Sequence, residues 1–114
     1  WNSIAEQQGG LPIAEALRNS NPAFKDRAIP GPVNYPQLPE LAVRGTDRAR
    51  KFFDMLEERL QESPFVACDH FTLADISTFV FLDFARVIKM RIPEGHSATQ
   101  AWYDGIQARP SAQL

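Results

Sequence analysis

The sequence has little cysteine, no long apolar run and no marked excess of charge of either sign. Its single cysteine excludes an internal disulfide and is typical of a reducing, cytoplasmic compartment. The longest uncharged apolar-rich run near the centre, Ile76 to Leu82, has seven residues, well short of the ~20 of a membrane-spanning helix. The twelve basic residues are interleaved with fourteen acidic ones, so no basic stripe marks a nucleic-acid site. We therefore expect a soluble cytoplasmic protein that binds neither membranes nor nucleic acids.

The sequence also lacks the alternating pattern of a β-strand. Its 114 residues fit one domain, and apolar residues recur at helical spacing in four segments. Gly9, Gly10 and Pro12 interrupt the first segment, which predicts a kinked or two-part helix. The fold class is therefore all-α, a helical bundle. The four predicted helices span residues 1–18, 40–62, 72 to about 90, and 98 to about 109.

Proline is concentrated between the first two predicted helices. Residues 19–39 hold five of the nine prolines, which excludes regular helix and predicts a long loop. Such a loop is either an ordered connection over the surface or the edge of a binding cleft, because long connections in compact domains are often functional.

A cluster of chemically reactive side chains precedes the third predicted helix: Cys68, Asp69, His70 and Asp75. A nucleophilic thiol needs a base and an orienting group, which usually come from distant parts of a chain. A zinc site usually needs about four ligands, and one cysteine with only two histidines, His70 and His96, supplies few. We therefore expect neither a catalytic residue nor a metal site at this cluster.

The stretch FTLADIS is better interpreted as the start of a helix. Thr72 and Asp75 have the spacing of a capping box, in which each side chain binds the other residue's backbone N–H. Phe71 and Ile76 have the spacing of a hydrophobic staple. Ser97 and Gln100 repeat the capping-box spacing before the last predicted helix. The pattern predicts two helix starts.

The third predicted helix is apolar around most of its circumference. This distribution predicts a position at the centre of the bundle. One stripe consists of Leu73, Ile76, Val80, Phe84 and Val87, and further apolar surface comes from Phe79, Phe81, Leu82 and Ile88. Asp83 lies among these apolar residues, so we expect it to pair with Arg86. In the last helix, the residues expected to point inward are Ala98, Ala101, Trp102 and Ile106.

Two stretches, FFDMLEERLQESPFVACDHFTLADIS and AWYDGIQARPSAQ, resemble the C-terminal helical domain of bacterial-type cytosolic glutathione S-transferases. The resemblance is strongest over residues 50–110, and we assign residues 1–114 to one such domain. Phe71, Thr72, Asp75 and Ile76 occupy the places of the capping box and staple that the family shares. Cys68 stands where the family usually has glycine.

The resemblance implies that two domains of the full-length protein have different functions. In this family an N-terminal thioredoxin-like domain, absent from this chain, binds and activates glutathione. The helical domain supplies a wall of the pocket for a small electrophile and much of a homodimer interface. We therefore expect no catalytic residue here, and Trp1 and Ile4 are the predicted substrate contacts. The chain starts at Trp1, within a predicted helix, so we expect it to be part of a longer protein. The alternative is a non-catalytic assembly or ligand-binding module with the same helical domain.

Overall fold

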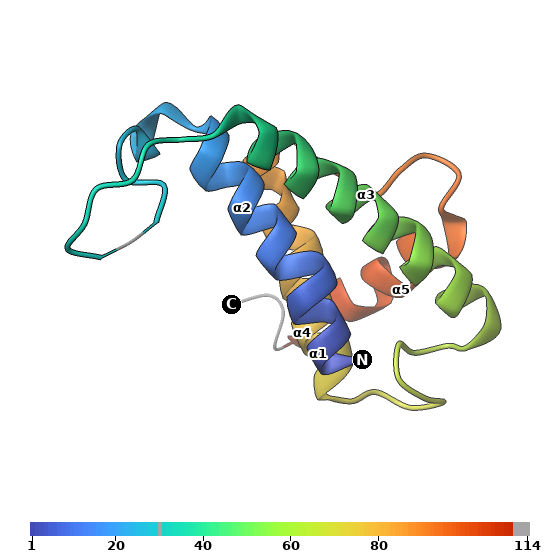
Figure 1. Cartoon of the computed structure of the whole chain (residues 1–114). Helices are drawn as coiled ribbons and strands as arrows, with labels where there is room; N and C mark the ends of the chain where they lie inside the picture. Colours follow the sequence, from blue (N-terminus) through green and yellow to red (C-terminus); the bar gives the residue numbers. More distant parts are fainter. Residues whose placement is uncertain (30, 111–114) are drawn as a thin grey trace.

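Helices form the whole regular structure of the described residues, 1–29 and 31–110, in a computed structural model (Figure 1). No strand occurs in these ranges, so the predicted all-α fold is confirmed. The elements in chain order are α1 (Asn2–Ile4), the π-helical turn η1 (Ala5–Gly10), α2 (Leu11–Ser20), the 3-10 turn η2 (Pro22–Phe24), α3 (Pro39–Glu62), α4 (Leu73–Phe84), the 3-10 turn η3 (Ala85–Ile88) and α5 (Ser97–Gln107).

The first rod of the bundle consists of α1, η1 and α2, joined without a break in helical backbone. In η1 the N–H of Leu11 bonds to the carbonyl of Glu6, one residue further back than in an α-helix. Pro12 has no N–H to offer, so the carbonyl of Gln7 is left over. The guanidinium of Arg48 donates to that carbonyl at 2.9 Å. The predicted two-part helix is therefore a single rod with a π-turn at the Gly-Gly-x-Pro sequence.

The glycine pair in η1 lets two aromatic rings approach the backbone. A Cβ atom on Gly9 would lie 2.9 Å from the ring of Phe52 on α3. One on Gly10 would lie 2.6 Å from the ring of Phe81 on α4. Both distances are shorter than van der Waals contact, so the glycines are needed for α3 and α4 to pack against this turn.

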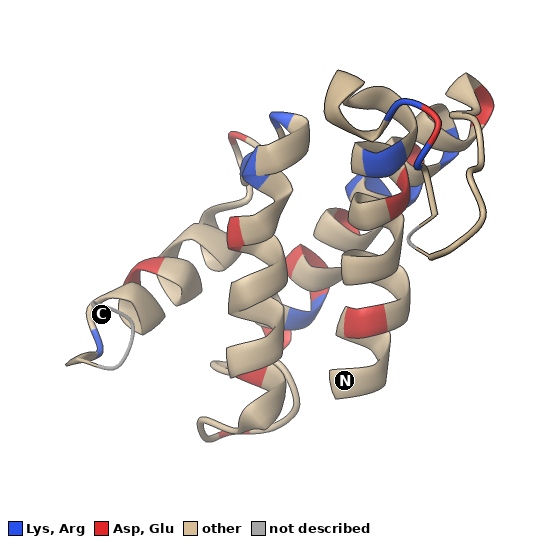
Figure 2. Ribbon diagram, turned by 90° about the vertical axis from the view of Figure 1, so that its left-hand side faces the viewer, with Lys and Arg blue, Asp and Glu red and all other residues tan. Residues whose placement is uncertain are grey.

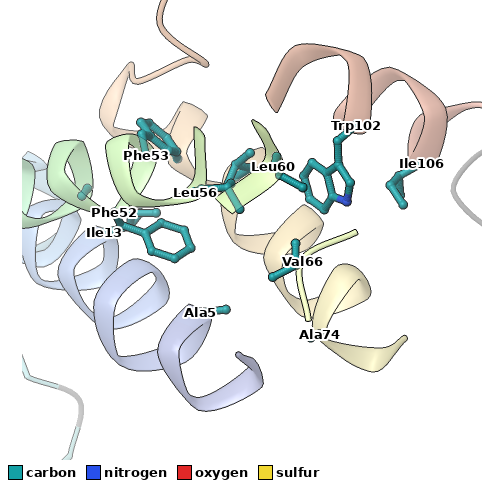
Figure 3. Packing of buried hydrophobic residues seen from close by; sticks show 13 residues of the cluster. Ala5, Ile13, Phe52, Phe53, Leu56, Leu60, Val66, Ala74, Trp102 and Ile106 are labelled. Carbon is teal, nitrogen blue, oxygen red and sulfur yellow. The ribbon is translucent and has the colours of Figure 1, made fainter. Parts of the chain in front are cut away.

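The long helix α3 organises the hydrophobic core. It packs along α2 and also contacts η1 and α5. Figure 3 shows Phe52 beside Ile13 of α2, and Trp102 of α5 pointing toward Leu60. Trp102 and Ile106 are buried, as predicted for the last helix, whereas Ala101 is exposed, against the prediction. The core side chains from α3 are Ala49, Phe52, Phe53, Leu56 and Leu60.

The helix predicted for residues 72 to about 90 is shorter in the structure. Regular α-helix ends at Phe84 and continues only as the 3-10 turn η3. Lys89 then takes a left-handed conformation with φ 60°, and the N–H of Met90 bonds back to the carbonyl of Ala85. This is the bonding pattern that commonly ends helices. Helical turns thus end at Ile88, close to the predicted end at about Met90, but the last four residues are 3-10 and not α-helical.

Most of the apolar stripe of α4 faces solvent and not the bundle centre. Leu73, Ile76, Val80 and Val87 are 64%, 46%, 54% and 44% exposed. The fifth residue of the stripe, Phe84, packs against the core, as do Phe79 and Phe81. The buried residues of α4 are Ala74, Asp75, Thr78 and Leu82. Figure 2 shows α4, vertical in the middle, with few charged residues along its length. The prediction that this stripe faces the bundle centre was therefore wrong for these four residues, because apolar periodicity does not reveal which side of a helix meets a neighbour. The helix itself lies between the first rod and α5 (Figure 2), with contacts to both.

The predicted capping box of the last helix is also absent. The helix α5 begins at Ser97, so its N-cap is His96, and no side chain of His96 caps it. Ser97 is one position too late in the helix to cap it. The prediction from the Ser97 and Gln100 spacing was wrong because a different helix provides the cap.

Glu57 of α3 caps α5 from across the bundle. Its carboxylate accepts from the N–H of Thr99 at 2.9 Å, from the Thr99 hydroxyl at 2.8 Å and from the N–H of Ala98 at 3.3 Å. Gln61 donates to it at 2.9 Å. Burial alone would raise the pKa of Glu57, but these hydrogen bonds outweigh it and lower the pKa to about 2. A buried carboxylate thus joins α3 to the positive end of α5.

The proline-rich loop extends away from the helices (Figure 1) and is tied down at both of its ends. The side-chain amide of Gln37 donates to the carbonyls of Arg18 and Asn21 at 3.0 and 2.6 Å. The side chain of Asn19 accepts from the N–H of Leu38. These bonds order the ends of the loop, and residues 20–22 of the same segment also line a hollow, so the two sequence-based alternatives both remain open. Among the described residues, no helix is both long and apolar enough to cross a membrane.

Candidate functional site

A small hollow lies between the first rod and α3, and it contains one of the two predicted substrate contacts. It encloses about 360 Å³, which is within the range of small-ligand pockets. Ile4, Phe52 and Met55 give it apolar walls. Gln8, Arg48 and Lys51 complete its lining.

The charged groups of this hollow are partly occupied by the protein itself. Arg48 donates to the carbonyl of Gln7, as described above. Lys51 pairs with Asp47 at 3.2 Å on the surface of α3. Lys51 is exposed and Arg48 is partly exposed, so the hollow combines apolar walls with a positively charged rim.

Trp1, the other predicted contact, precedes α1 and is half-buried against the core. Its carbonyl accepts from the N–H of Ala5 at 2.8 Å, which starts the first rod. The next residue, Asn2, accepts a hydrogen bond from Ser77 of α4. Trp1 and Ile4 therefore lie at the end of the rod that contacts α4.

A larger hollow, of about 950 Å³, lies at the other end of the molecule. Residues from the end of α2, the turn η2, the start of α3 and the turn η3 line it, including Pro22, Val43 and Ile88. Charges of both signs, among them Arg50 and Asp47, contribute to the lining. This hollow could not be predicted from the sequence, since residues from three distant segments form it.

The capping box of α4 is present, and its carboxylate binds far more than the cap. Both reciprocal bonds between Thr72 and Asp75 are formed, and the N–H of Thr72 donates to Oδ2 of Asp75 at 2.9 Å. Oδ1 of the same carboxylate accepts from the N–H of Val66 and from the indole N–H of Trp102, each at 2.9 Å. The side chain of Asp75 is completely buried. Its role in this arrangement is structural, because no face of the carboxylate reaches solvent.

Phe71, before the cap, packs away from the solvent-facing stripe of α4. Its ring meets the ring of Phe65 edge to face, with centroids 6.3 Å apart. The guanidinium of Arg109 lies 3.7 Å from the ring centroid, a cation–π contact. Ile76, the other member of the predicted staple, is among the exposed residues of α4.

The loop before α4 brings three potential ligands together. Donor atoms of Cys68, Asp69 and His70 all lie within 4.8 Å of one another. Nδ1 of His70 is 3.5 Å from Sγ of Cys68 and 3.0 Å from Oδ1 of Asp69. The hydrogen bond from His70, followed by its charge, lowers the pKa of Asp69. The number of potential ligands in the sequence had not indicated that the donor atoms of these three residues lie close together.

Asp83 forms the predicted pair with Arg86, at 2.9 Å. Tyr103 of α5 donates its hydroxyl hydrogen to the other carboxylate oxygen, also at 2.9 Å. Burial, and then the hydrogen bond to Asp83, raise the pKa of Tyr103. The ring of Tyr103 stacks on Phe79 with centroids 4.8 Å apart. This group of residues joins α4 to α5.

Comparison with known families identifies the class of protein to which this fold belongs. Residues 14–105 match the family model described as glutathione S-transferase, C-terminal domain. The match covers most of the chain, and the chain therefore belongs to this family. The resemblance inferred from the sequence is confirmed.

Two curated relatives carry glutathione S-transferase names. Glutathione S-transferase 2 of Saccharomyces cerevisiae is 38% identical over 113 residues, which cover 98% of this chain and 46% of the relative. Glutathione S-transferase F6 of Arabidopsis thaliana is 36% identical over 64 residues, 55% of this chain and 31% of that protein.

Solved structures give the same result at the level of the fold. The crystal structure of Gtt2 from Saccharomyces cerevisiae superposes with a TM-score of 0.85 at 30% identity, covering 98% of this chain and 51% of that one. A glutathione S-transferase domain-containing protein from Marinobacter aquaeolei has a TM-score of 0.78 at 28% identity, covering 97% and 52%. The chain thus spans about half the length of these relatives.

Proposed function

We propose that this chain is the substrate-pocket and dimerisation domain of a cytoplasmic, homodimeric glutathione transferase that conjugates glutathione to small apolar electrophiles. The observation that carries the proposal is the 38% identity to a protein named glutathione S-transferase over almost the whole chain. The helical domain would hold the co-substrate beside the activated thiol, which lowers the entropic cost of reaction.

Glutathione activation would belong to the other half of the protein. The relatives are about twice as long as this chain, which leaves room for the thioredoxin-like domain that the family resemblance implies. Glutathione would be a co-substrate bound chiefly there. Accordingly, the helical domain alone is expected to show no conjugating activity.

We assign Ile4 and Trp1 to the co-substrate side of the first rod. Ile4 contributes an apolar wall to the hollow of about 360 Å³, and Trp1 precedes it at the same end of the rod. An apolar electrophile gains from such walls through burial of its own surface. This geometry supports the assignment, which mutagenesis can test.

We further assign the exposed stripe of α4 to the contact with the other half. This stripe consists of Leu73, Ile76, Val80 and Val87, and it is large and apolar for a surface facing water. The length missing relative to the relatives is sufficient for a second domain to cover it. A partner domain would bury the stripe as interdomain interfaces do.

A capture experiment followed by an activity assay tests the proposed function. The full-length protein containing this chain is passed over immobilised glutathione and then assayed with a chromogenic electrophile. Retention and turnover are expected for the full-length protein, and no turnover for residues 1–114 alone. A full-length protein that neither binds the resin nor turns over would refute the proposal and favour a non-catalytic assembly or ligand-binding module.

A further inference from the structure

We propose that the loop carrying Cys68, Asp69 and His70 is a binding site for one divalent cation of borderline softness, in the first instance Zn²⁺. The three side chains offer a thiolate, a carboxylate and an imidazole, with donor atoms within 4.8 Å of one another. Zinc accepts all three of these ligand types, whereas magnesium and calcium prefer oxygen alone. The site is independent of the proposed transferase activity.

The separation between the sulfur and nitrogen donors fits one small cation. Zn–S and Zn–N bonds of about 2.3 and 2.0–2.1 Å, at a tetrahedral angle, place sulfur and nitrogen about 3.5 Å apart. Sγ of Cys68 and Nδ1 of His70 are 3.5 Å apart. Oδ1 of Asp69 lies 3.0 Å from the same Nδ1, which is hydrogen-bonding distance. Nδ1 is therefore the ring nitrogen nearest Sγ and also lies near Oδ1, with Sγ 3.7 Å from Nε2. A cation would bind this nitrogen in its deprotonated form.

The backbone of the loop is held in place before any cation binds. Arg59 of α3 donates to the carbonyls of Val66 and Ala67 at 2.7 and 3.0 Å. The hydroxyl of Ser63 donates to the carbonyl of Cys68 at 2.9 Å. Three successive carbonyls thus have fixed partners, and a fixed backbone reduces the conformational entropy lost when ligands close around an ion.

The charge and exposure of the ligands define what kind of site this is. A thiolate and a carboxylate supply two negative charges for a divalent ion, and the imidazole binds in its neutral form. The side chains of Asp69 and His70 are 90% and 73% exposed, so water can complete the coordination. Three protein ligands plus water is the pattern of open zinc sites, whereas structural sites have four protein ligands. An exchangeable ion fits this geometry.

Titration with metal alone tests the site. An untagged chain, with Cys68 kept reduced, is titrated with Zn²⁺ by calorimetry and with Co²⁺ by absorption spectroscopy. We expect one ion per chain and a thiolate-to-cobalt charge-transfer band. Both Cys68→Ser and His70→Gln should weaken Zn²⁺ binding roughly tenfold or more, and the band should be absent in Cys68→Ser.

His96→Gln provides the matched control, because His96 pairs with Asp54 on another part of the surface. It should bind Zn²⁺ as the unaltered chain does. Circular dichroism confirms that each variant is folded before titration. Absence of saturable binding, or equal affinity in Cys68→Ser and the unaltered chain, would overturn the proposal. Either result would leave the proposed glutathione transferase function untouched.

Discussion

The indole N–H of Trp102 donates to Oδ1 of Asp75 at 2.9 Å, across 27 positions of sequence. The same oxygen accepts from the N–H of Val66. Through this carboxylate the loop before α4, the start of α4 and the inward face of α5 share one buried acceptor. A residue that looks like a local helix cap is therefore a junction of three segments.

Replacing Asp75 should cost more stability than loss of a cap. A lost N-cap costs about 1 kcal/mol, but Asp75→Ala also leaves the N–H groups of Val66 and Trp102 unpaired. Each buried unpaired donor costs about 1–3 kcal/mol, so we expect a fall of about 3–7 kcal/mol in the free energy of unfolding. Urea denaturation followed by circular dichroism measures it.

Trp102→Phe is the matched comparison for Asp75→Ala. It removes one donor and keeps an aromatic ring in the core, so we expect a smaller loss, about 1–2 kcal/mol. If Asp75→Ala proved no more destabilising than Trp102→Phe, the hydrogen bonds of Asp75 to several segments would not explain how it stabilises the fold.

Acid should weaken the protein through Glu57. Its pKa in the folded state is about 2, below its ordinary value of 4.5, so its deprotonated form is favoured by folding. The stabilisation is complete above pH 4.5 and is lost progressively as pH falls from 4.5 toward about 2.

Glu57→Gln isolates this effect. The amide cannot ionise, so the variant should be less stable at neutral pH and its free energy of unfolding should fall less steeply between pH 4.5 and 2. Thermal unfolding across this range gives both quantities. Identical pH slopes in the two proteins would show that Glu57 is not the titrating group.

Gly45 should be irreplaceable because two backbones meet there. A Cβ on Gly45 would lie 2.5 Å from the carbonyl oxygen of Pro12 and 2.9 Å from the nitrogen of Ala16. Gly45→Ala must separate α2 from α3 and should cost about 1–3 kcal/mol or more. Gly105→Ala, in an open position of α5, should instead stabilise by up to about 1 kcal/mol through helix propensity.

Chemical denaturation of these two glycine variants should give changes of opposite sign in the free energy of unfolding if the packing argument is correct. Equal effects would mean that helix propensity, and not the close approach of α2 and α3, governs the response at Gly45.

A charged substitution in the exposed stripe of α4 should leave the stability of the chain alone unchanged and should lower the stability of the full-length protein. Val80→Lys puts a charge on a surface that we assign to the other half, so it should destabilise the full-length protein by about 1–3 kcal/mol. Val43→Lys, on an exposed position of α3, should have little effect in either. Differential scanning calorimetry of both lengths measures this, and no difference between the two variants in the full-length protein would exclude α4 as the contact.

The sequence predicted what local chemistry determines. Helical periodicity predicted four helical segments, and the Thr72–Asp75 spacing located the start of α4 to the residue. The Gly-Gly and Pro12 signals located the irregular turn in the first rod.

Interactions between distant segments could not be predicted in the same way. No pattern in the sequence indicates that Glu57 caps α5, because its partners Ala98 and Thr99 are more than forty positions away. The orientation of α4 is equally hidden, since apolar residues lie on nearly all its sides. For the site, the family resemblance named Ile4 as a substrate contact. The hollow that Ile4 lines could not be predicted from the sequence, because α3 supplies most of its lining.

The most direct test of the account is steady-state kinetics of the full-length protein with Ile4→Ala. If Ile4 contacts the electrophile, loss of about 1 kcal/mol of apolar contact should raise the KM for the electrophile about fivefold. The KM for glutathione should stay unchanged, and Leu11→Ala, at an exposed residue of the same rod, should leave both values unaltered. An unchanged KM for the electrophile in Ile4→Ala, or a rise in the KM for glutathione alone, would contradict the assignment of this domain as the wall of the electrophile pocket.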